Sequence, residues 1–268
     1  MSEPVVLRAE QRDLSALLRL WEDVFGDPPE MIETFFRYFS PEKSGWVVKR
    51  DDCLCSAAYL LTGNILSLAD GSLPAGYVYA VATVPEERGK GYAGMLMQRI
   101  SEYAAERGFI LYTRPASERL FGWYGKTLRT DRVSRMTETM YLSDDAVSAD
   151  PVSRIDPASY GIIREKRLMN RAHVVLSDPF LCLQDCFSDG FYAVGDGAAC
   201  CMLKGNALYI PELLCPDEQC SAAVQSLIRF FDADSAILRR QQPNGDSPLV
   251  AFSGDDQHAK TDWGLLLE

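Results

Sequence analysis

A short loop that contains three glycines is the part of this sequence best suited to bind a ligand. It reads Arg88-Gly89-Lys90-Gly91-Tyr92-Ala93-Gly94 and follows an apolar stretch that ends at Pro85. Glycine lets the backbone approach a ligand closely because it has no Cβ atom. If a helix begins here, its first N–H groups lack intrahelical partners and lie at the positive end of the helix dipole. Such a loop binds phosphate groups, and Arg88 and Lys90 add positive charge at the same place.

Two common nucleotide-binding motifs fit the loop less well. Gly89-x-Gly91-x-x-Gly94 satisfies the dinucleotide pattern GxGxxG, but that match alone is weak. We expect two helices and three strands before it, and the next strand ends at Thr113-Arg114, without an acid to bind a ribose. A GxxxxGK[ST] phosphate loop is excluded because Gly91 follows Lys90. The alternative without a ligand is a glycine turn that only opens a helix.

Apolar periodicity and turn signals predict the elements that position this loop. The helix over 92–107 has Tyr92, Leu96, Ile100 and Tyr103 on one face, and Gly108 ends it. We expect further helices over 13–25, 29–39 and from Ser117 to about residue 126. We expect strands over 5–8, 45–50, 54–62, 77–84, 109–113 and 133–142. A turn at Gly63-Asn64 leads into one more strand, which ends at about residue 69.

The loop and its surroundings resemble the GNAT family of N-acetyltransferases. The family's central motif, Arg/Gln-x-x-Gly-x-Gly/Ala after a strand, is matched by Arg88 to Ala93. The preceding Val81-Ala82-Thr83-Val84-Pro85 resembles the family's strand, which ends in a proline. The resemblance covers about residues 4–142. It implies an α/β fold with a mixed, mostly antiparallel, splayed sheet and flanking helices.

The resemblance also implies acetyl-coenzyme A as the co-substrate. The strands on either side of the helix would splay apart, and Val81, Ala82 and Thr83 would pair with the amides of pantetheine. A backbone N–H of the same strand would stabilise the thioester oxyanion, where charge develops in the transition state. The pyrophosphate would be held by the backbone N–H groups of Arg88, Gly89, Lys90, Gly91, Tyr92, Ala93 and Gly94.

A second family signature is a helix with an Asn near its start and a Phe-Tyr pair. The matching stretch here is Ser117-Glu118-Arg119-Leu120-Phe121-Gly122-Trp123-Tyr124. Tyr124 falls on the family's general acid, and a phenol with a pKa of about 10 carries its proton at neutral pH. The alternative is a packed helix aromatic. Ser117 replaces the usual Asn, and Leu128-Arg129 stands where the family has Gly-Phe.

The acceptor should be an amine, which must lose a proton before it attacks. No carboxylate is clearly placed for this, since Glu86 and Glu87 belong to the phosphate loop. Tyr77 and Tyr79 lie on the splayed strand and line either the acceptor site or the core. A water relay is the default, and the terminal carboxylate of Glu268 is a remote alternative.

The rest of the chain predicts a second, smaller α/β domain. Residues 144–159 are rich in Asp, Ser, Ala and Pro and indicate a linker between domains at 1–143 and 160–268. The order strand pair, strand, helix, strand (191–194, 198–203, 207–214, 221–231, 236–240) repeats the first half and suggests a degenerate GNAT-like copy. Its loop, Leu213-Leu214-Cys215-Pro216-Asp217-Glu218-Gln219, has no glycine and carries acids, so we expect no coenzyme A site there.

Composition and charge bound the partners. The chain has 268 residues, of which 47% are hydrophobic and 24% charged, and a net charge of −11. That balance disfavours nucleic acid. The ten basic and four acidic residues of 88–135 instead suggest a small anionic ligand. The start of the sequence lacks a secretory signal pattern, and no apolar run reaches the roughly 18 residues that cross a membrane. The eight cysteines form no CxxC pair. We expect a cytoplasmic protein with no metal site and free cysteines.

These observations predict an N-acetyltransferase that uses acetyl-CoA. The acceptor is a primary amine of a small molecule or a peptide. Direct attack in a ternary complex is expected because no positioned Cys or Ser nucleophile is recognisable. The alternative is a catalytically idle acyl-CoA-binding or interaction module, and a third option is transfer of a longer acyl chain.

Overall fold

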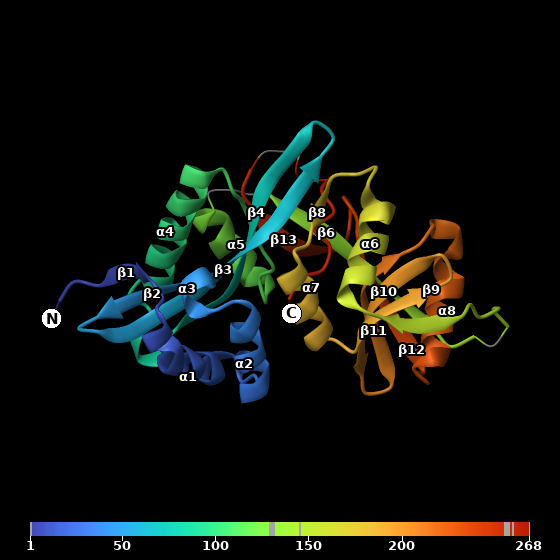
Figure 1. Ribbon diagram of the computed structural model, residues 1–268, viewed down its shortest axis with the longest axis horizontal. Helices are drawn as coiled ribbons and strands as arrows, with labels where there is room; N and C mark the ends of the chain where they lie inside the picture. Colours follow the sequence, from blue (N-terminus) through green and yellow to red (C-terminus); the bar gives the residue numbers. More distant parts are fainter. Residues whose placement is uncertain (1, 129–131, 145, 255–257, 259, 268) are drawn as a thin grey trace.

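One continuous mixed sheet runs through the molecule (Figure 1). The computed structural model describes residues 2–128, 132–144, 146–254, 258 and 260–267. Thirteen strands of this part of the chain form the sheet. Their order is β1 (Val5–Arg8), β2 (Gly45–Arg50), β3 (Cys53–Leu68), β4 (Gly71–Thr83), β5 (Ile110–Thr113), β13 (Ser247–Phe252), β6 (Val133–Leu142), β12 (Ser235–Gln241), β11 (Ala207–Leu214), β10 (Gly197–Lys204), β9 (Gly190–Val194) and β7 (Val152–Ile155), with β8 (His173–Val175) beside β3.

Helices flank this sheet in both halves (Figure 1). In the first half they are α1 (Leu14–Phe25), α2 (Pro29–Tyr38), α3 (Pro41–Ser44), α4 (Tyr92–Arg107) and α5 (Glu118–Thr127). In the second half they are α6 (Pro157–Leu168), α7 (Asp178–Cys186) and α8 (Cys220–Phe230). Short 3-10 turns precede three of them, namely η1 (Gln11–Asp13), η2 (Pro85–Glu87) and η3 (Asp217–Gln219). The predicted mixed, mostly antiparallel α/β fold is confirmed.

Apolar stripes attach the helices of the first half to the sheet. Trp21 of α1 packs against Phe35 of α2 and Tyr59 of β3, with ring centroids 4.7 and 5.2 Å apart. A separate buried cluster lies under α4 and includes Leu96 and Ile100. The glycine C-caps of α1 and α4, Gly26 and Gly108, adopt the left-handed conformation that ends a helix.

The predicted turn at Gly63-Asn64 is wrong. β3 runs through both residues, with a bulge between Leu61 and Asn64 in its pairing with β4. Asn64 is buried, donates to the hydroxyl of Tyr112 at 2.8 Å, and accepts the N–H of Ser177 at 2.9 Å. These distant partners use the polar side chain that resembles a turn signal, and the chain reverses only before Gly71.

The segment predicted as a linker, residues 144–159, contains regular structure. Strand β7 forms within it and pairs with β9. Asp156 then caps α6, accepting the N–H of Ser159 at 2.9 Å. The division into domains at 143 and 160 stays a prediction, and the sheet crosses it, since β13 lies between β5 and β6.

The two halves share one arrangement of strands. In the first half β2, β3 and β4 pair antiparallel, and β4 pairs parallel with β5. In the second half β9, β10 and β11 pair antiparallel, and β11 pairs parallel with β12. The crossover helices are α4 and α8. Each half therefore has one parallel pair of strands that is able to diverge.

Candidate active site

A wedge opens between β4 and β5. The two strands pair only from Ala75 opposite Ile110 to Tyr77 opposite Tyr112. Beyond that point β5 ends at Thr113, while β4 continues to Thr83. Among the described residues no strand pairs with this edge of β4 beyond Tyr77, and an extended ligand with amide groups can pair with its backbone.

A bulge interrupts β4 inside the wedge. Tyr79 pairs with Tyr59 and Ala82 with Ala57, so Ala80 and the next residue share one partner position on β3. Ala80 has φ of 45°, a conformation that costs an L-residue about 1–3 kcal/mol. Strained backbone of this kind concentrates at functional sites, where it re-aims backbone groups. The wedge is thus more than a frayed end of the sheet.

The glycine loop lies at the end of this strand and opens α4. Gly89 and Gly91 have φ of 81° and 86°, and Gly91 is the N-cap of α4. A Cβ atom at Gly89, Gly91 or Gly94 would meet no atom within 4 Å. Packing therefore does not require a glycine at Gly94, although glycine within a helix costs about 1 kcal/mol relative to alanine. The space above the loop at Gly94 is open.

The charged residues of the loop are partly neutralised within the protein. Lys90 Nζ lies 2.9 Å from Glu87 Oε1, and Arg50 reaches the same carboxylate at 3.0 Å. Arg88 Nε donates to the carbonyl of Thr83 at 3.3 Å. The pKa of Glu87 is lowered, first by its hydrogen bond with Lys90. Backbone N–H groups, more than these side chains, are left to receive an anion.

A cavity of about 440 Å³ fills the inner part of the wedge. It lies between the exposed edge of β4, the end of β5, the start of α5, the end of α1 and the C-terminal segment. Its walls are mainly apolar and aromatic, with a few polar groups, as in most small-molecule sites. They are formed by Trp21, Phe25, Asp27, Val78, Tyr79, Ala80, Val81, Thr113, Arg114, Pro115, Ala116, Leu120, Tyr124 and Leu267.

Tyr124 lies in the wall of this cavity. Only 8% of its surface is exposed, and burial raises its pKa to about 12. A hydrogen bond with the Thr113 side chain acts in the opposite direction. Thr113 Oγ1 itself donates to the carbonyl of Val78 at 2.8 Å, so the phenol, β5 and β4 are linked at the point where the strands part.

Not all the predicted ligand residues lie at the cavity. Val81 lines it, whereas Ala82 is buried and Thr83 Oγ1 lies 2.9 Å from Ser56 Oγ. Ser117 is the N-cap of α5 and is exposed, with no hydrogen bond from its side chain to the helix. Tyr92 is buried, and its hydroxyl accepts from Arg50 at 3.1 Å. The remaining members of the loop, Ala93 and Gly94, are half-buried at the mouth of the wedge.

Of the two tyrosines considered for the acceptor site, one lies at the cavity and the other in the core. Tyr79 lines the cavity. Tyr77 is only 1% exposed, belongs to the core, and donates to the carbonyl of Leu267 at 3.2 Å. Leu267 lines the cavity, which brings the C-terminal segment to the site. Glu268 and Arg129, both singled out from the sequence, lie outside the described residues.

Sequence reasoning missed Asp27. This residue follows Gly26, which ends α1, and its carboxylate lines the cavity. Trp21 Nε1 donates to Asp27 Oδ2 at 2.8 Å and fixes its position. Burial and the charge of Asp27 raise the pKa of Tyr79. No local pattern marks an acid in an interhelical turn, so only the fold reveals that it faces the cavity.

Three further observations concern ligands and location. No group of three or more His, Cys, Asp or Glu among the described residues could hold a metal ion. All eight cysteines are free. Within the described part of the chain, no helix is long and apolar enough to cross a membrane.

A split mixed sheet with a glycine loop at the mouth of its wedge defines the acetyltransferase class of fold. Residues 6–126 match the family model described as an acetyltransferase (GNAT) domain. The first half of this chain is therefore similar to the GNAT acetyltransferase domain. The search of curated proteins found no match.

Solved structures share this fold along nearly the whole chain. A GCN5-related N-acetyltransferase from Kribbella flavida is 16% identical, with a TM-score of 0.69 over 94% of this chain and 70% of its own. One from Anabaena variabilis is also 16% identical, with a TM-score of 0.65 over 94% and 71%. A Pyrococcus horikoshii protein is 14% identical, with a TM-score of 0.66 over 100% and 95%. At such identity these likenesses concern the fold alone.

Proposed function

We propose that this protein transfers an acetyl group from acetyl-CoA to a primary amine by direct attack in a ternary complex. One observation carries the proposal. The unpaired edge of β4 leads from the glycine loop at Gly91 directly into the cavity that Tyr124 lines. An extended carrier on this edge would have its phosphates at the loop and its reactive end beside the phenol.

The residues present fit coenzyme A along most of its length. The freed backbone of Val81 to Thr83 is able to pair with pantetheine amides, and the first N–H groups of α4 suit the pyrophosphate. The open space above Gly89, Gly91 and Gly94 supports the same assignment. The bound carrier supplies an activated thioester, and the protein supplies position and proton transfer.

The proposed transfer forms a bond from the amine nitrogen to the acetyl carbon and breaks the bond from that carbon to sulfur. Starting from the ammonium form, the nitrogen loses two protons, one before it attacks and one as the amide forms, and the sulfur gains one. Tyr124 donates the proton to sulfur, because its raised pKa keeps the phenol protonated at neutral pH. Asp27 lies in the wall of the same cavity and is our candidate to bind the ammonium and accept its proton.

The walls favour a cationic amine carried on an apolar or aromatic scaffold. Trp21, Phe25 and Tyr79 present ring surfaces beside the Asp27 carboxylate. Aromatic faces attract ammonium groups by about 0.5–2 kcal/mol, and a carboxylate adds a charged hydrogen bond. The net charge of −11 also raises the local concentration of cations.

A module that binds acyl-CoA without turnover is the second candidate. The position of Ser117 favours it, since this side chain is exposed at the helix N-cap and outside the cavity wall. An acyl-CoA-binding module would bind acetyl-CoA saturably but would release no thiol with any acceptor.

The deciding assay measures release of free thiol from acetyl-CoA with a panel of primary amines. The proposal expects turnover with cationic aromatic amines and much less with anionic ones. Acyl-CoA thioesters of increasing chain length, compared in the same assay, test the acyl preference. Saturable binding without turnover across the panel would leave only the binding module.

A further inference from the structure

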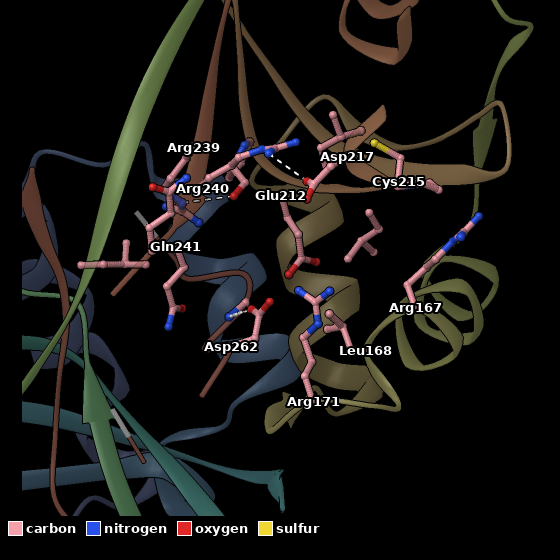
Figure 2. A pocket seen from close by; sticks show the side chains of 17 residues that line it. Arg167, Leu168, Arg171, Glu212, Cys215, Asp217, Arg239, Arg240, Gln241 and Asp262 are labelled. Carbon is pink, nitrogen blue, oxygen red and sulfur yellow. Dashed lines mark hydrogen bonds and ion pairs between the residues drawn. The ribbon is translucent and has the colours of Figure 1, made fainter. Parts of the chain in front are cut away.

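The second half contains its own wedge and cavity. β11 and β12 pair in parallel from Ala207 opposite Ser235 to Ile210 opposite Leu238. Both strands continue beyond that point, to Leu214 and Gln241. A cavity of about 420 Å³ begins where the pairing stops and is lined by the ends of both strands, the end of α6 and the C-terminal segment (Figure 2). Crevices at the carboxyl ends of diverging parallel strands are preferred ligand sites.

The walls of this cavity are charged, unlike those of the first wedge. Four arginines line it: Arg167, Arg171, Arg239 and Arg240. Three acids line it as well: Glu212, Asp217 and Asp262. In Figure 2 the side chains of Arg171, Glu212 and Asp262 point into a common space. The net charge of the cavity wall therefore depends on which of these side chains are already paired within the protein.

The acids have partners within the protein. Glu212 accepts from Arg164 Nε at 3.0 Å and from the Tyr160 hydroxyl at 2.5 Å. Asp217 pairs with Arg240 at 3.1 Å, although 91% of the Asp217 side chain is exposed. Asp262 accepts the N–H of Gly264 at 3.0 Å, and burial raises its pKa.

Two of the arginines are not paired with a carboxylate among the described residues. Arg167 donates to the carbonyl of Asp196, a neutral group. Within the described residues, no hydrogen bond or ion pair engages the side chain of Arg171, which is exposed. Four arginines line the cavity against three acids, and Glu212 is already paired with Arg164, so the net charge of the wall is positive. The surrounding half of the chain has a net charge of −9.

A buried guanidinium under the wall supports the same conclusion. Arg164 is 1% exposed, and its Nη2 has no hydrogen-bond partner in the described structure. A Cβ atom at Gly264 would overlap this nitrogen, and Gly264 lines the cavity with φ of 67°. Glycine is needed here both for the conformation and for the close approach. An unsatisfied charged donor thus lies directly beneath the cavity.

The same residues disfavour coenzyme A in this wedge. Arg239 of β12 donates to the Pro211 carbonyl of β11, so this carbonyl is already engaged and is less able to pair with a pantetheine amide. Asp217 and Glu218 precede α8, where a pyrophosphate would meet like charge. A compact ligand held by side chains fits this cavity better than an extended carrier held by backbone.

We propose that this cavity binds a small molecule with two or more negatively charged oxygen groups, such as a phosphate ester or a polycarboxylate. Guanidinium groups present planar forks that bind carboxylate and phosphate oxygens in pairs. Arg171 and Arg167 meet the anion at the mouth, and the buried Arg239 lies at the floor. The site is separate from the acetyl-transfer cavity, and only the C-terminal segment touches both, through Gly264 and Leu267.

Calorimetric titration of the full chain with pyrophosphate and with citrate, in a phosphate-free buffer, tests the proposal. Arg171→Gln is the main variant. The side chain of Arg171 is exposed and makes no hydrogen bond or ion pair within the described structure, so the substitution should not disturb the fold. We expect it to weaken binding about tenfold, the equivalent of one charged contact of about 1.4 kcal/mol. Binding of only one probe would assign the anion to that chemical class, and binding of neither would overturn the proposal.

Two control variants distinguish a specific site from general attraction of anions. Arg19→Gln removes an exposed arginine of α1 and changes the net charge equally, so it should leave the affinity unchanged. Gly94→Ala closes the open space above the glycine loop of the first half and should also leave the affinity unchanged. An equal loss in Arg19→Gln would show nonspecific attraction, and a loss in Gly94→Ala alone would show binding at the glycine loop. Either result would refute an anion site between β11 and β12.

Discussion

Replacing Tyr124 with Phe removes one hydroxyl and keeps the ring that packs in the cavity wall. The phenol is the proposed proton donor, and general acid catalysis contributes about 10²–10⁴ in rate. We expect kcat to fall by about 100-fold or more while the affinity for acetyl-CoA changes little. The substitution removes one buried polar group, and a change of about 1 kcal/mol or less would shift the melting temperature by no more than about 2–4 °C in a chain of this size.

The pH dependence follows from the same side chain. Burial raises the pKa of Tyr124 to about 12, above the usual value of about 10. The phenol is neutral in both the folded and the unfolded chain below pH 10. Its contribution to stability is therefore complete there and is lost as the pH rises through about 12. In the native enzyme, kcat should show no loss of this proton below about pH 11.

Steady-state kinetics of thiol release, with acetyl-CoA binding measured separately by calorimetry, would test this. Tyr103→Phe is the matched control, since Tyr103 lies on α4 against Trp46, away from the cavity. Equal losses of turnover and of cofactor affinity in Tyr124→Phe would assign Tyr124 to packing. Full activity would remove it from the mechanism altogether.

The other predictions concern the acceptor, the loop and the buried ion pair. Asp27→Asn should raise KM for cationic amines about tenfold and leave KM for neutral amines unchanged. Only a charged acceptor uses the carboxylate of Asp27. Equal effects on both kinds of amine would contradict this role. Gly94→Ala should stabilise the free protein by up to about 1 kcal/mol but weaken coenzyme A binding, whereas Gly122→Ala in α5 should stabilise it without that loss. Calorimetry and thermal melts compare the two, and unchanged affinity in Gly94→Ala would argue against phosphate above the loop. Arg164→Met should lower the free energy of unfolding by about 3–5 kcal/mol in denaturant titration, because it leaves the buried Glu212 without its cation. Adding Glu212→Leu should recover part of that loss. A loss in the double variant as large as in the single variant would contradict a stabilising role of the pair.

Local signals predicted several elements with their observed bounds. These are β1 (Val5–Arg8), β2 (Gly45–Arg50), α4 (Tyr92–Arg107), β6 (Val133–Leu142) and β11 (Ala207–Leu214). Helix α4 is the clearest case, because Gly91 and Gly108 end it through their own left-handed conformation. Such signals act within a few residues, so they hold whatever the rest of the chain does. The glycine loop is local in this sense and was visible in the sequence.

Signals that depend on distant partners were misleading or silent. Gly63-Asn64 has the composition of a turn, yet Asn64 is used by Tyr112 and Ser177. β13 has no strong pattern of its own but completes the sheet between β5 and β6. Residues far apart in sequence supply the hydrogen-bond partners in each case, and local propensity contains no information about them.

The candidate site likewise contains parts that the sequence predicted and parts that only the fold brings together. The glycine loop and the helix with Tyr124 are runs of neighbouring residues, and the resemblance of these runs to the GNAT family predicted a carrier and a proton donor. Asp27 and Leu267 are 240 positions apart and reach one cavity only because the sheet brings α1 and the C-terminal segment to the same wedge. The acceptor side of this protein, and the charged cavity between β11 and β12, were therefore decided by long-range packing, which adjacent residues do not encode.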